Sequence, residues 1–290
     1  GIKSMNPNLI TIANNHILDY DADGLYSTIN LLHDMGIPYI GAGENIKEAS
    51  KPYIIEGSNK KIGVYSCTEN EFSVASKSKP GANPYDPLES FDQIESLKSK
   101  TDYVIVLYHG GKEHYRYPSP DLQRITRKMV SKGADLVVCQ HSHCIGCYEK
   151  FQDSTIIYGQ GNFLFNKYDN EYWNNGILIK IVFKKNIEID YIPIVKNGNG
   201  IRLAERELGQ EILADFEERS KQILLNGFIE ANYEKLARDQ INSYLRYFLG
   251  YGKWMSRIDR RIFRGILTKK KYNKEILLTV LNHIECEAHR

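Results

Sequence analysis

The stretch that decides the fold is Val137–Cys147, VVCQHSHCIGC, in which an apolar run ends in two histidines one residue apart. An apolar run of this length predicts a buried strand, and the His-x-His after it would present two imidazoles at the mouth of a sheet. Imidazole is the commonest side-chain metal ligand in proteins. We therefore expect a metal or phosphate site where this strand ends.

Three further apolar runs end in the same kinds of side chain. Because the carboxyl ends of parallel strands meet at one edge of a sheet, these runs predict a single metal-dependent site at that edge. They are LITIA (9–13) before Asn14, Asn15 and His16, YVIVLY (103–108) before His109, and TIIYGQ (155–160) before Gly161 and Asn162.

The rest of the chain up to residue 200 predicts a layered α/β fold. Helical patterns over 25–35, 88–99 and 121–132 alternate with strand patterns, an order typical of a parallel sheet. The alternating run 174–195 predicts an antiparallel hairpin that closes this sheet. After about residues 198–202 the pattern becomes helical, so we predict a first domain over 1–200 and a C-terminal helical extension over 201–290.

Composition places limits on the compartment. With 290 residues and 42% hydrophobic content the chain can bury a sizeable core. Its net charge of +2 is too small to indicate a class of charged partner. No apolar run approaches the roughly 18 residues that span a bilayer, so we expect a soluble protein. The chain opens with Gly close to a strand, which predicts that the natural protein begins upstream. The odd number of cysteines favours a reducing, cytoplasmic compartment; they are Cys67, Cys139, Cys144, Cys147 and Cys286.

The cysteines also allow a second interpretation. Cys144 and Cys147 form a CxxC, the spacing of many structural zinc sites, but no second CxxC is present. We therefore favour free thiols over a structural zinc.

The polar side chains at the predicted edge divide by their chemistry. Neutral imidazoles suit Zn, Mn or Fe, and an amide oxygen can complete a hydrated site. A divalent pair held there would activate water and clamp the transferring group. The predicted metal ligands are Asn15, His109, His141 and His143.

Catalytic and substrate-binding roles fall to other residues. Proton donation to a leaving group needs a side chain of the histidine type near neutral pH, so His16 could take that role, while Asp19 could orient its imidazole or cap the following helix. Glu69 and Glu71 follow a strand at the same edge and could bind metal or a cationic substrate group, or remain solvated loop acids. The candidate substrate contacts are Glu69, Glu71, Glu113, Arg116 and Asn162.

A strongly basic stretch lies near the C-terminus. Residues 246–274 contain ten Lys or Arg and one acid, Asp259, with Tyr247, Phe248, Tyr251, Trp254 and Phe263 interleaved. The stretch is either a solvated helical face whose aromatics pack on the α/β core, or a peripheral contact with an anionic membrane or acidic polymer. No nucleic-acid module accompanies the charge, so nucleic acid is not an expected partner.

The ordered motifs of residues 8–165 resemble the CapA family of capsule-biosynthesis proteins, also called the poly-gamma-glutamate synthesis family. Its domain is similar to calcineurin-like metallophosphatases. The resemblance implies a metallophosphatase-like sheet sandwich in which Asn15, His109, His141 and His143 are metal-binding positions and His16 is the catalytic histidine. The motifs are ANNHILDYDADG (13–24), GAGENIKEA (41–49), LYHGGKEHYRYPSP (107–120), GADLVVCQHSHC (133–144) and GQGNF (159–163).

This chain departs from the family pattern in three places. A Gly-Asp and an Asn-Leu-Glu motif of the family lie upstream of residue 1, and that Asp would bridge or bind the first metal. The family's Trp after the first His is Gly110 here, and its Gly-His before the His-x-His pair is Cys139 and Gln140.

The resemblance also implies a function. It is that of a metal-dependent hydrolase of the phosphoesterase type in capsule polysaccharide or poly-gamma-glutamate biosynthesis, with a dinuclear Mn, Zn or Fe centre. The expected partners are an anionic polymer or phosphorylated substrate and components of a capsule synthase. From the cysteine content the expected location is the cytoplasm, and the basic stretch 246–274 leaves open a peripheral contact with the inner membrane face. The alternative is a non-catalytic module that binds a polymer or lipid-linked intermediate and assists the synthase.

Overall fold

The computed structural model describes residues 1–57, 59–165, 170–184, 187–248, 250–273 and 276–280. Lys274, Cys286 and the side chains of Tyr247 and Phe248 lie outside this description. The chain divides into two compact units, Gly1–Ile229 and Glu230–Arg290. The first unit continues past the predicted boundary near 198–202, because α7 (Arg206–Gln222) packs on strands of that unit.

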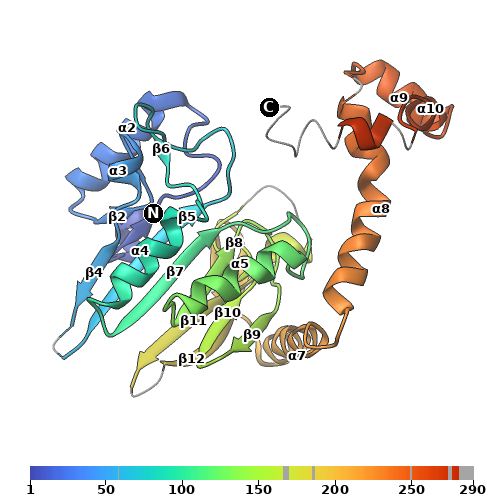
Figure 1. The fold of residues 1–290 in the computed structure, drawn as a ribbon. Helices are drawn as coiled ribbons and strands as arrows, with labels where there is room; N and C mark the ends of the chain where they lie inside the picture. The colour runs from blue at the N-terminus through green and yellow to red at the C-terminus, as the bar shows by residue number, and fades with distance from the viewer. Residues whose placement is uncertain (58, 166–169, 185–186, 249, 274–275, 281–290) are drawn as a thin grey trace. The chain divides into compact units, whose positions relative to one another are not determined.

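A six-stranded mixed sheet forms the centre of the first unit (Figure 1). Its four middle strands are parallel, as the alternating strand and helix patterns predicted, and each edge strand is the antiparallel partner in a hairpin. The strand order is β4 (Tyr53–Glu56), β5 (Lys61–Thr68), β7 (Tyr103–His109), β8 (Leu136–Gln140), β10 (Ser154–Ile157) and β9 (Tyr148–Phe151).

Both faces of this sheet are apolar because successive side chains of a strand point to opposite sides. Val104 and Val106 of β7 join the core under α4 (Glu89–Lys98) and α5 (Pro120–Ser131), whereas Ile105 joins the core on the other face. α5 begins where Ser119 caps it, its hydroxyl accepting a 3.0 Å hydrogen bond from the Leu122 amide. The layered α/β fold predicted from the sequence is therefore present.

A separate three-stranded antiparallel sheet covers the second face. It consists of β11 (Asn175–Phe183), β12 (Ile187–Asn197) and β13 (Gly200–Leu203), and α7 packs beside it. The predicted hairpin is present, but the prediction that it closes the main sheet is wrong. β9 already pairs with the outer side of β10, so the hairpin cannot extend the main sheet there. Its face packs on the face of the main sheet instead, with Ile177 and Val195 in a shared core with Leu136. Residues 201–203 are likewise strand rather than helix.

The N-terminal segment forms its own small subdomain. Here β1 (Ile10–Thr11) pairs in parallel with β2 (Tyr39–Ile40), and β3 (Ala42–Gly43) pairs with β6 (Gly81–Ala82). The run LITIA is thus outside the main sheet, and the expectation of four strands ending at one sheet edge is wrong for this run. The helices of the segment are α1 (Ile2–Met5), α2 (Asp21–Asp34) and α3 (Ile46–Ala49).

Side-chain contacts nevertheless hold this subdomain against the main sheet. The Thr11 hydroxyl lies 2.5 Å from the hydroxyl of Ser66 in β5. Gly41 has φ +88°, and a Cβ there would lie 2.6 Å from the Ala13 Cβ, so the turn after β2 accepts only glycine without strain. The loop after β1 is therefore fixed beside the carboxyl ends of β5 and β7.

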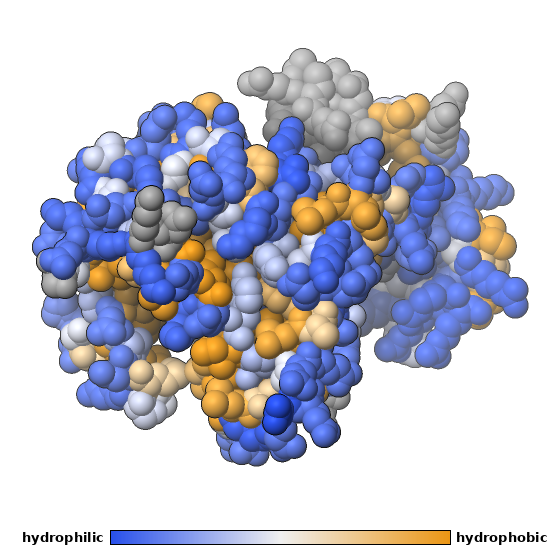
Figure 2. Space-filling model, turned by 90° about the horizontal axis from the view of Figure 1, so that it is seen from below, coloured by the Kyte–Doolittle hydropathy of each residue, from blue (hydrophilic) through white to orange (hydrophobic). Residues whose placement is uncertain are grey.

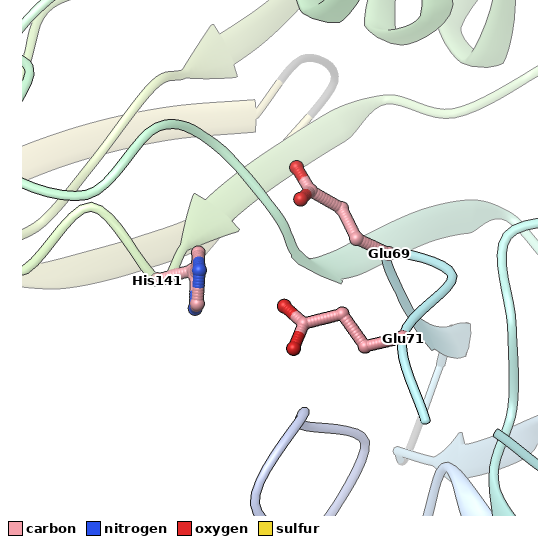
Figure 3. Close-up of side chains that lie close together, drawn as sticks. All are labelled: Glu69, Glu71 and His141. Carbon is pink, nitrogen blue, oxygen red and sulfur yellow. The ribbon is translucent and has the colours of Figure 1, made fainter. Parts of the chain in front are cut away.

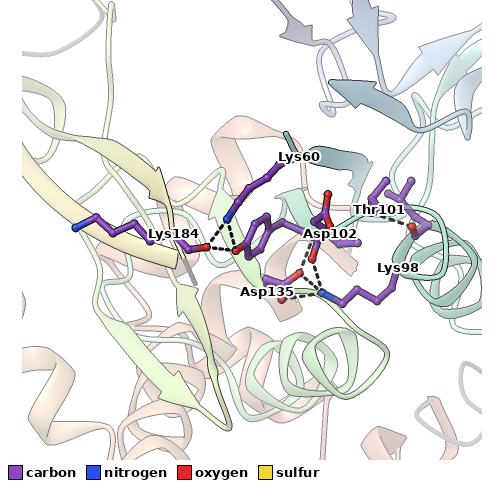
Figure 4. A network of polar contacts seen from close by, with 9 residues as sticks. Lys60, Lys98, Thr101, Asp102, Asp135 and Lys184 are labelled. Atoms are coloured by element: carbon purple, nitrogen blue, oxygen red, sulfur yellow. Dashed lines mark hydrogen bonds and ion pairs between the residues drawn. The ribbon is translucent and has the colours of Figure 1, made fainter. Parts of the chain in front are cut away.

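The opposite edge of the main sheet is closed by a polar network (Figure 4). The Lys98 ammonium donates to both carboxylate oxygens of Asp135, at 2.8 and 3.0 Å, and Asp135 accepts from the Val104 amide at 2.7 Å. Lys60 and the Tyr103 hydroxyl both donate to the Lys184 carbonyl, which ties the β11–β12 turn to the sheet. This network therefore links α4, β7 and the end of β11.

The remaining elements are helical. α6 (Glu171–Asn174) precedes β11, and α8 (Phe228–Phe248), α9 (Lys253–Arg261) and α10 (Ile266–Lys271) follow α7. Of the helices in the described ranges, none combines the length and apolar character needed to cross a membrane.

Candidate metal centre

Five of the predicted residues meet in one group, which we call the carboxylate–histidine cluster. Nε2 of His109 lies 3.1 Å from Oδ1 of Asn15 and 3.1 Å from Nδ1 of His141. The Asn15 amide donates to the Glu71 carboxylate at 3.3 Å. One ligand atom from each of Glu69, Glu71 and His141 lies within 4.8 Å of the others, and Figure 3 shows both carboxyl groups directed toward the His141 side.

The parallel strands place these side chains at the same level. Thr68, the last residue of β5, is in register with His109 of β7, and His109 is in register with Gln140 of β8. The loops that leave these strands therefore start side by side, with Glu69 and Glu71 from β5 and His141 from β8. Asn15 arrives from the N-terminal subdomain and is almost fully buried.

Gly110 makes room for one of the two carboxylates. Oε1 of Glu69 accepts a 2.6 Å hydrogen bond from the Gly111 amide. A Cβ at Gly110 would lie 2.7 Å from the Tyr108 ring and 2.8 Å from Oε1 of Glu69. A tryptophan at position 110, as the family pattern has it, would displace the Glu69 carboxylate from the position seen here.

The two histidines of the His-x-His pair have an uncommon backbone conformation. His141 has φ +93° and His143 has φ +54°, values that non-glycine residues rarely adopt. Such conformations persist only where the surroundings impose them, and they concentrate at functional sites. The strand therefore ends in a tight turn that separates the two imidazoles.

His143 lies beside the cluster rather than within it. Its Nδ1–H donates to Oδ1 of Asn162 at 2.9 Å, and its ring stacks on Trp173 with centroids 4.7 Å apart. Its centroid is 6.1 Å from that of His141. Asn162 is thus a partner of a predicted metal ligand. Trp173 could not be recognised from the sequence, because a single aromatic before a strand carries no periodic signal.

His16 and Asp19 form a pair of their own on the exposed side. The Nδ1–H of His16 donates to Oδ2 of Asp19 at 2.8 Å, and the two side chains are 63% and 43% exposed. The N-cap residue of α2 is Tyr20, which makes no side-chain capping hydrogen bond. Asp19 therefore contacts His16 and is not the N-cap residue of α2.

Burial keeps the cluster imidazoles neutral. Burial, followed by the nearby charges of His141, His143 and His16, lowers the pKa of His109 to about 3. Burial also lowers the pKa of His141, against the opposing influence of Glu69, Glu113 and Glu71. Neutral imidazoles keep a lone pair for a metal, so the site is prepared for ligation near neutral pH.

The depressed pKa of His109 predicts that the metal-free protein loses stability in acid. An unfolded histidine has a pKa near 6.5, so below that pH the unfolded state binds a proton that the folded state excludes. Stability is thus fully present above about pH 6.5 and falls toward pH 3, by about 2 kcal/mol between pH 7 and pH 5. Urea unfolding of chelator-treated protein at the two pH values measures this. His109→Asn should have the shallower dependence, and an equal slope in both proteins would contradict the assignment.

The structure places the other predicted residues outside the cluster. Glu113 is exposed and acts on His141 only through its charge. Arg116 donates to Glu171 at 2.5 Å and to the Ile145 carbonyl at 3.2 Å, with its guanidinium over the Tyr172 ring. Arg116 lines a cavity of about 210 Å³ whose lining includes none of the cluster residues.

The CxxC cysteines show no sign of a zinc site. Cys144 and Cys147 are buried, and burial raises the pKa of both thiols. Among the described residues, the group that could hold a metal contains no cysteine.

The donor atoms of the cluster fit a divalent transition metal. Ligand nitrogens and oxygens lie about 2.0–2.2 Å from zinc, which places neighbouring ligand atoms of one ion roughly 3.0–3.5 Å apart. The two 3.1 Å separations around Nε2 of His109 fall in this range. Imidazole, carboxylate and amide oxygen together also match Mn and Fe.

These observations define a layered α/β protein with a candidate metal centre of histidine, carboxylate and amide ligands at its sheet edge. Residues 1–167 match the family model described as "Bacterial capsule synthesis protein PGA_cap". The chain belongs to this family, as its motifs predicted.

Curated relatives and solved structures extend the comparison. The chain is 29% identical over 172 residues to the "Capsule biosynthesis protein CapA" of Bacillus anthracis, covering 57% of this chain and 42% of that protein. It is 29% identical over 170 residues to the "PGA biosynthesis protein CapA" of Bacillus subtilis, covering 57% and 44%. The chain thus spans less than half the length of these relatives. The structure of Haemophilus influenzae NAD nucleotidase is similar with a TM-score of 0.40 and 18% identity, over 74% of this chain and 41% of that chain.

Proposed function

We propose that this protein is a divalent-metal-dependent hydrolase of phosphoesters that acts in the synthesis of a capsule polymer. One observation carries the proposal: Nε2 of His109 faces both Oδ1 of Asn15 and Nδ1 of His141 at 3.1 Å, with two carboxylates beside them. Converging neutral imidazoles and carboxylates at the carboxyl edge of a parallel sheet suit metal-assisted hydrolysis.

The cluster offers enough ligands for two ions. Asn15, His109 and His141 would hold one ion, and the Glu69 and Glu71 carboxylates beside them would hold a second. A bound Mn, Zn or Fe ion would supply an activated water and polarise a phosphoryl oxygen. The protein would hold these ligands in place. Asn15 is buried and hydrogen-bonded to Glu71, so it fixes the N-terminal subdomain, which also carries His16, against the cluster.

His16 is the proposed proton donor. Asp19 accepts the Nδ1–H of His16, which fixes the ring orientation and leaves Nε2 free to carry the proton for the leaving oxygen. His16 also lies close enough for its charge to lower the pKa of His109. An exposed, oriented imidazole next to the cluster is what proton transfer to a departing alkoxide requires.

The substrate we propose is a phosphorylated group or an anionic polymer, with components of a capsule synthase as partners. Its support is the chemistry of the cluster, because a divalent ion held there would attract anionic oxygen atoms. Membership of the capsule-synthesis family supports the same class of substrate and partner.

A second candidate is a non-catalytic module that binds a lipid-linked or polymeric intermediate. It is favoured by a cavity of about 330 Å³ lined by Phe163, Phe165, Trp173 and Lys196. Phe165 packs against His143, with centroids 5.1 Å apart, so this cavity adjoins the cluster. An apolar wall with one cation suits an anionic group carried on an apolar chain.

Metal reconstitution separates the two candidates. Chelator-treated protein should hydrolyse para-nitrophenyl phosphate or its diester only after addition of Mn²⁺, Zn²⁺ or Fe²⁺, and chelator should reverse the gain. Metal binding without turnover of either ester would contradict the hydrolase and favour the binding module.

A further inference from the structure

The second unit contains a helical hairpin formed by α9 (Lys253–Arg261) and α10 (Ile266–Lys271). Its one acidic residue, Asp259, is completely buried. The Asp259 carboxylate accepts from the Leu267 amide at 3.1 Å and from the Thr268 hydroxyl at 2.5 Å. The only negative side chain of the hairpin is therefore used internally to join the two helices.

The cations of the hairpin are all directed outward. Each is exposed, and none forms an ion pair with a carboxylate within the described parts of the chain. With Asp259 buried, the outer surface of the hairpin carries positive charge alone. The cations are Lys253, Arg257, Arg260, Arg261, Arg264, Lys269, Lys270 and Lys271.

Large apolar side chains are exposed among these cations. Trp254 is 76% exposed, Ile262 68%, Ile266 59% and Phe263 41%. Trp254 and Ile262 are eight residues apart and so lie on the same side of the helix, while Ile262, Phe263 and Ile266 surround the turn between the helices. Both aromatic side chains of this hairpin, Trp254 and Phe263, are thus exposed.

Exposed apolar residues alone would not indicate a partner. Figure 2 shows hydrophobic residues reaching the surface between hydrophilic ones, as is normal for a folded protein. The hairpin differs because its apolar residues are enclosed by cations without carboxylate partners. Trp, Phe and Ile on a helix with many Lys and Arg are typical of segments that lie in a membrane interface.

We propose that the α9–α10 hairpin docks this protein on an anionic bilayer surface, with Trp254, Ile262, Phe263 and Ile266 entering the headgroup region and the cations contacting lipid phosphates. Charge complementarity and apolar exposure favour a bilayer over a soluble acidic polymer. Such a polymer would pair with the cations but leave the four apolar side chains in water.

Vesicle cosedimentation tests the electrostatic half of this proposal. The protein should sediment with phosphatidylcholine vesicles that contain phosphatidylglycerol but not with phosphatidylcholine alone, and salt should weaken the binding. Lys269→Glu, Lys270→Glu and Lys271→Glu together should weaken it at least tenfold at low salt. The matched control is Lys47→Glu, Lys77→Glu and Lys128→Glu, an equal charge change on exposed residues of the first unit, which should bind like wild type.

Changing only the apolar residues tests the other half. Ile262→Ser, Phe263→Ser and Ile266→Ser keep every charge, yet should weaken vesicle binding at least tenfold, with helicity checked by circular dichroism. Trp254 fluorescence should shift to the blue on anionic vesicles in wild type, and Trp254→Phe should lose that shift. The proposal is overturned if wild type ignores anionic vesicles at low salt, if the serine variant binds as well as wild type, or if soluble polyglutamate binds while vesicles do not.

Discussion

Replacing His141 with alanine is expected to remove both metal binding and hydrolysis. His141 lies close to both groups of donors, 3.1 Å from His109 and within 4.8 Å of the Glu69 and Glu71 carboxylates. Its loss should weaken metal affinity by at least roughly 100-fold, since even the mutation of a residue that only hydrogen-bonds to a metal ligand lowers affinity about 10- to 100-fold. Turnover at fixed metal should fall by at least as much.

Isothermal titration with Mn²⁺ or Zn²⁺ and an assay of phosphoester turnover measure the two effects. His33→Ala is the matched control, because His33 lies on α2 with an 87% exposed side chain and should behave as wild type. Wild-type metal affinity in His141→Ala would show that the cluster is not the metal site.

His16→Ala is expected to separate chemistry from metal binding. His16 contacts Asp19 and no member of the cluster through a hydrogen bond, so metal affinity should stay within about twofold of wild type. The loss of a general acid should lower kcat by about 100- to 10,000-fold. The loss should be largest for alkyl phosphates, whose leaving oxygen needs the proton most, and smallest for para-nitrophenyl esters.

Asp19→Asn serves as the companion variant. It keeps the size of the partner that orients His16 but removes its charge, so kcat should fall less than in His16→Ala while metal affinity is unchanged. An equal loss for alkyl and para-nitrophenyl esters in His16→Ala, or a loss of metal, would contradict the proton-donor role.

The sequence predicts the main sheet well because its strands are buried on both faces. YVIVLY and LVVCQ read as continuous apolar runs and form β7 and β8, whose side chains enter two cores. Polar residues that end such strands lie at one edge by geometry alone. His109 and His141 could therefore be placed together from sequence.

Other parts of the arrangement depend on tertiary packing that periodicity cannot report. LITIA pairs with a two-residue strand outside the main sheet, yet the Thr11 contact with Ser66 still brings Asn15 to His109. The alternation of 174–195 predicts a hairpin but not which surface it covers.

Single polar residues in loops are the hardest to assign from sequence. Glu69 and Glu71, grouped with the substrate contacts, lie with His141, and the Gly110–Gly111 backbone leaves space for the Glu69 carboxylate. Arg116 is instead paired with Glu171. His143 is held by Asn162 and Trp173, contacts that no spacing rule contains.

The most direct test of the metal centre is anomalous diffraction from crystals of the protein soaked in Mn²⁺ or Zn²⁺, recorded at the absorption edge of the metal. The structure predicts a peak about 2.0–2.3 Å from Nε2 of His109, Nδ1 of His141 and Oδ1 of Asn15, with a second peak toward Glu69 and Glu71 if two ions bind. A peak only at Cys144 and Cys147, or none within reach of His109 and His141, would contradict the account.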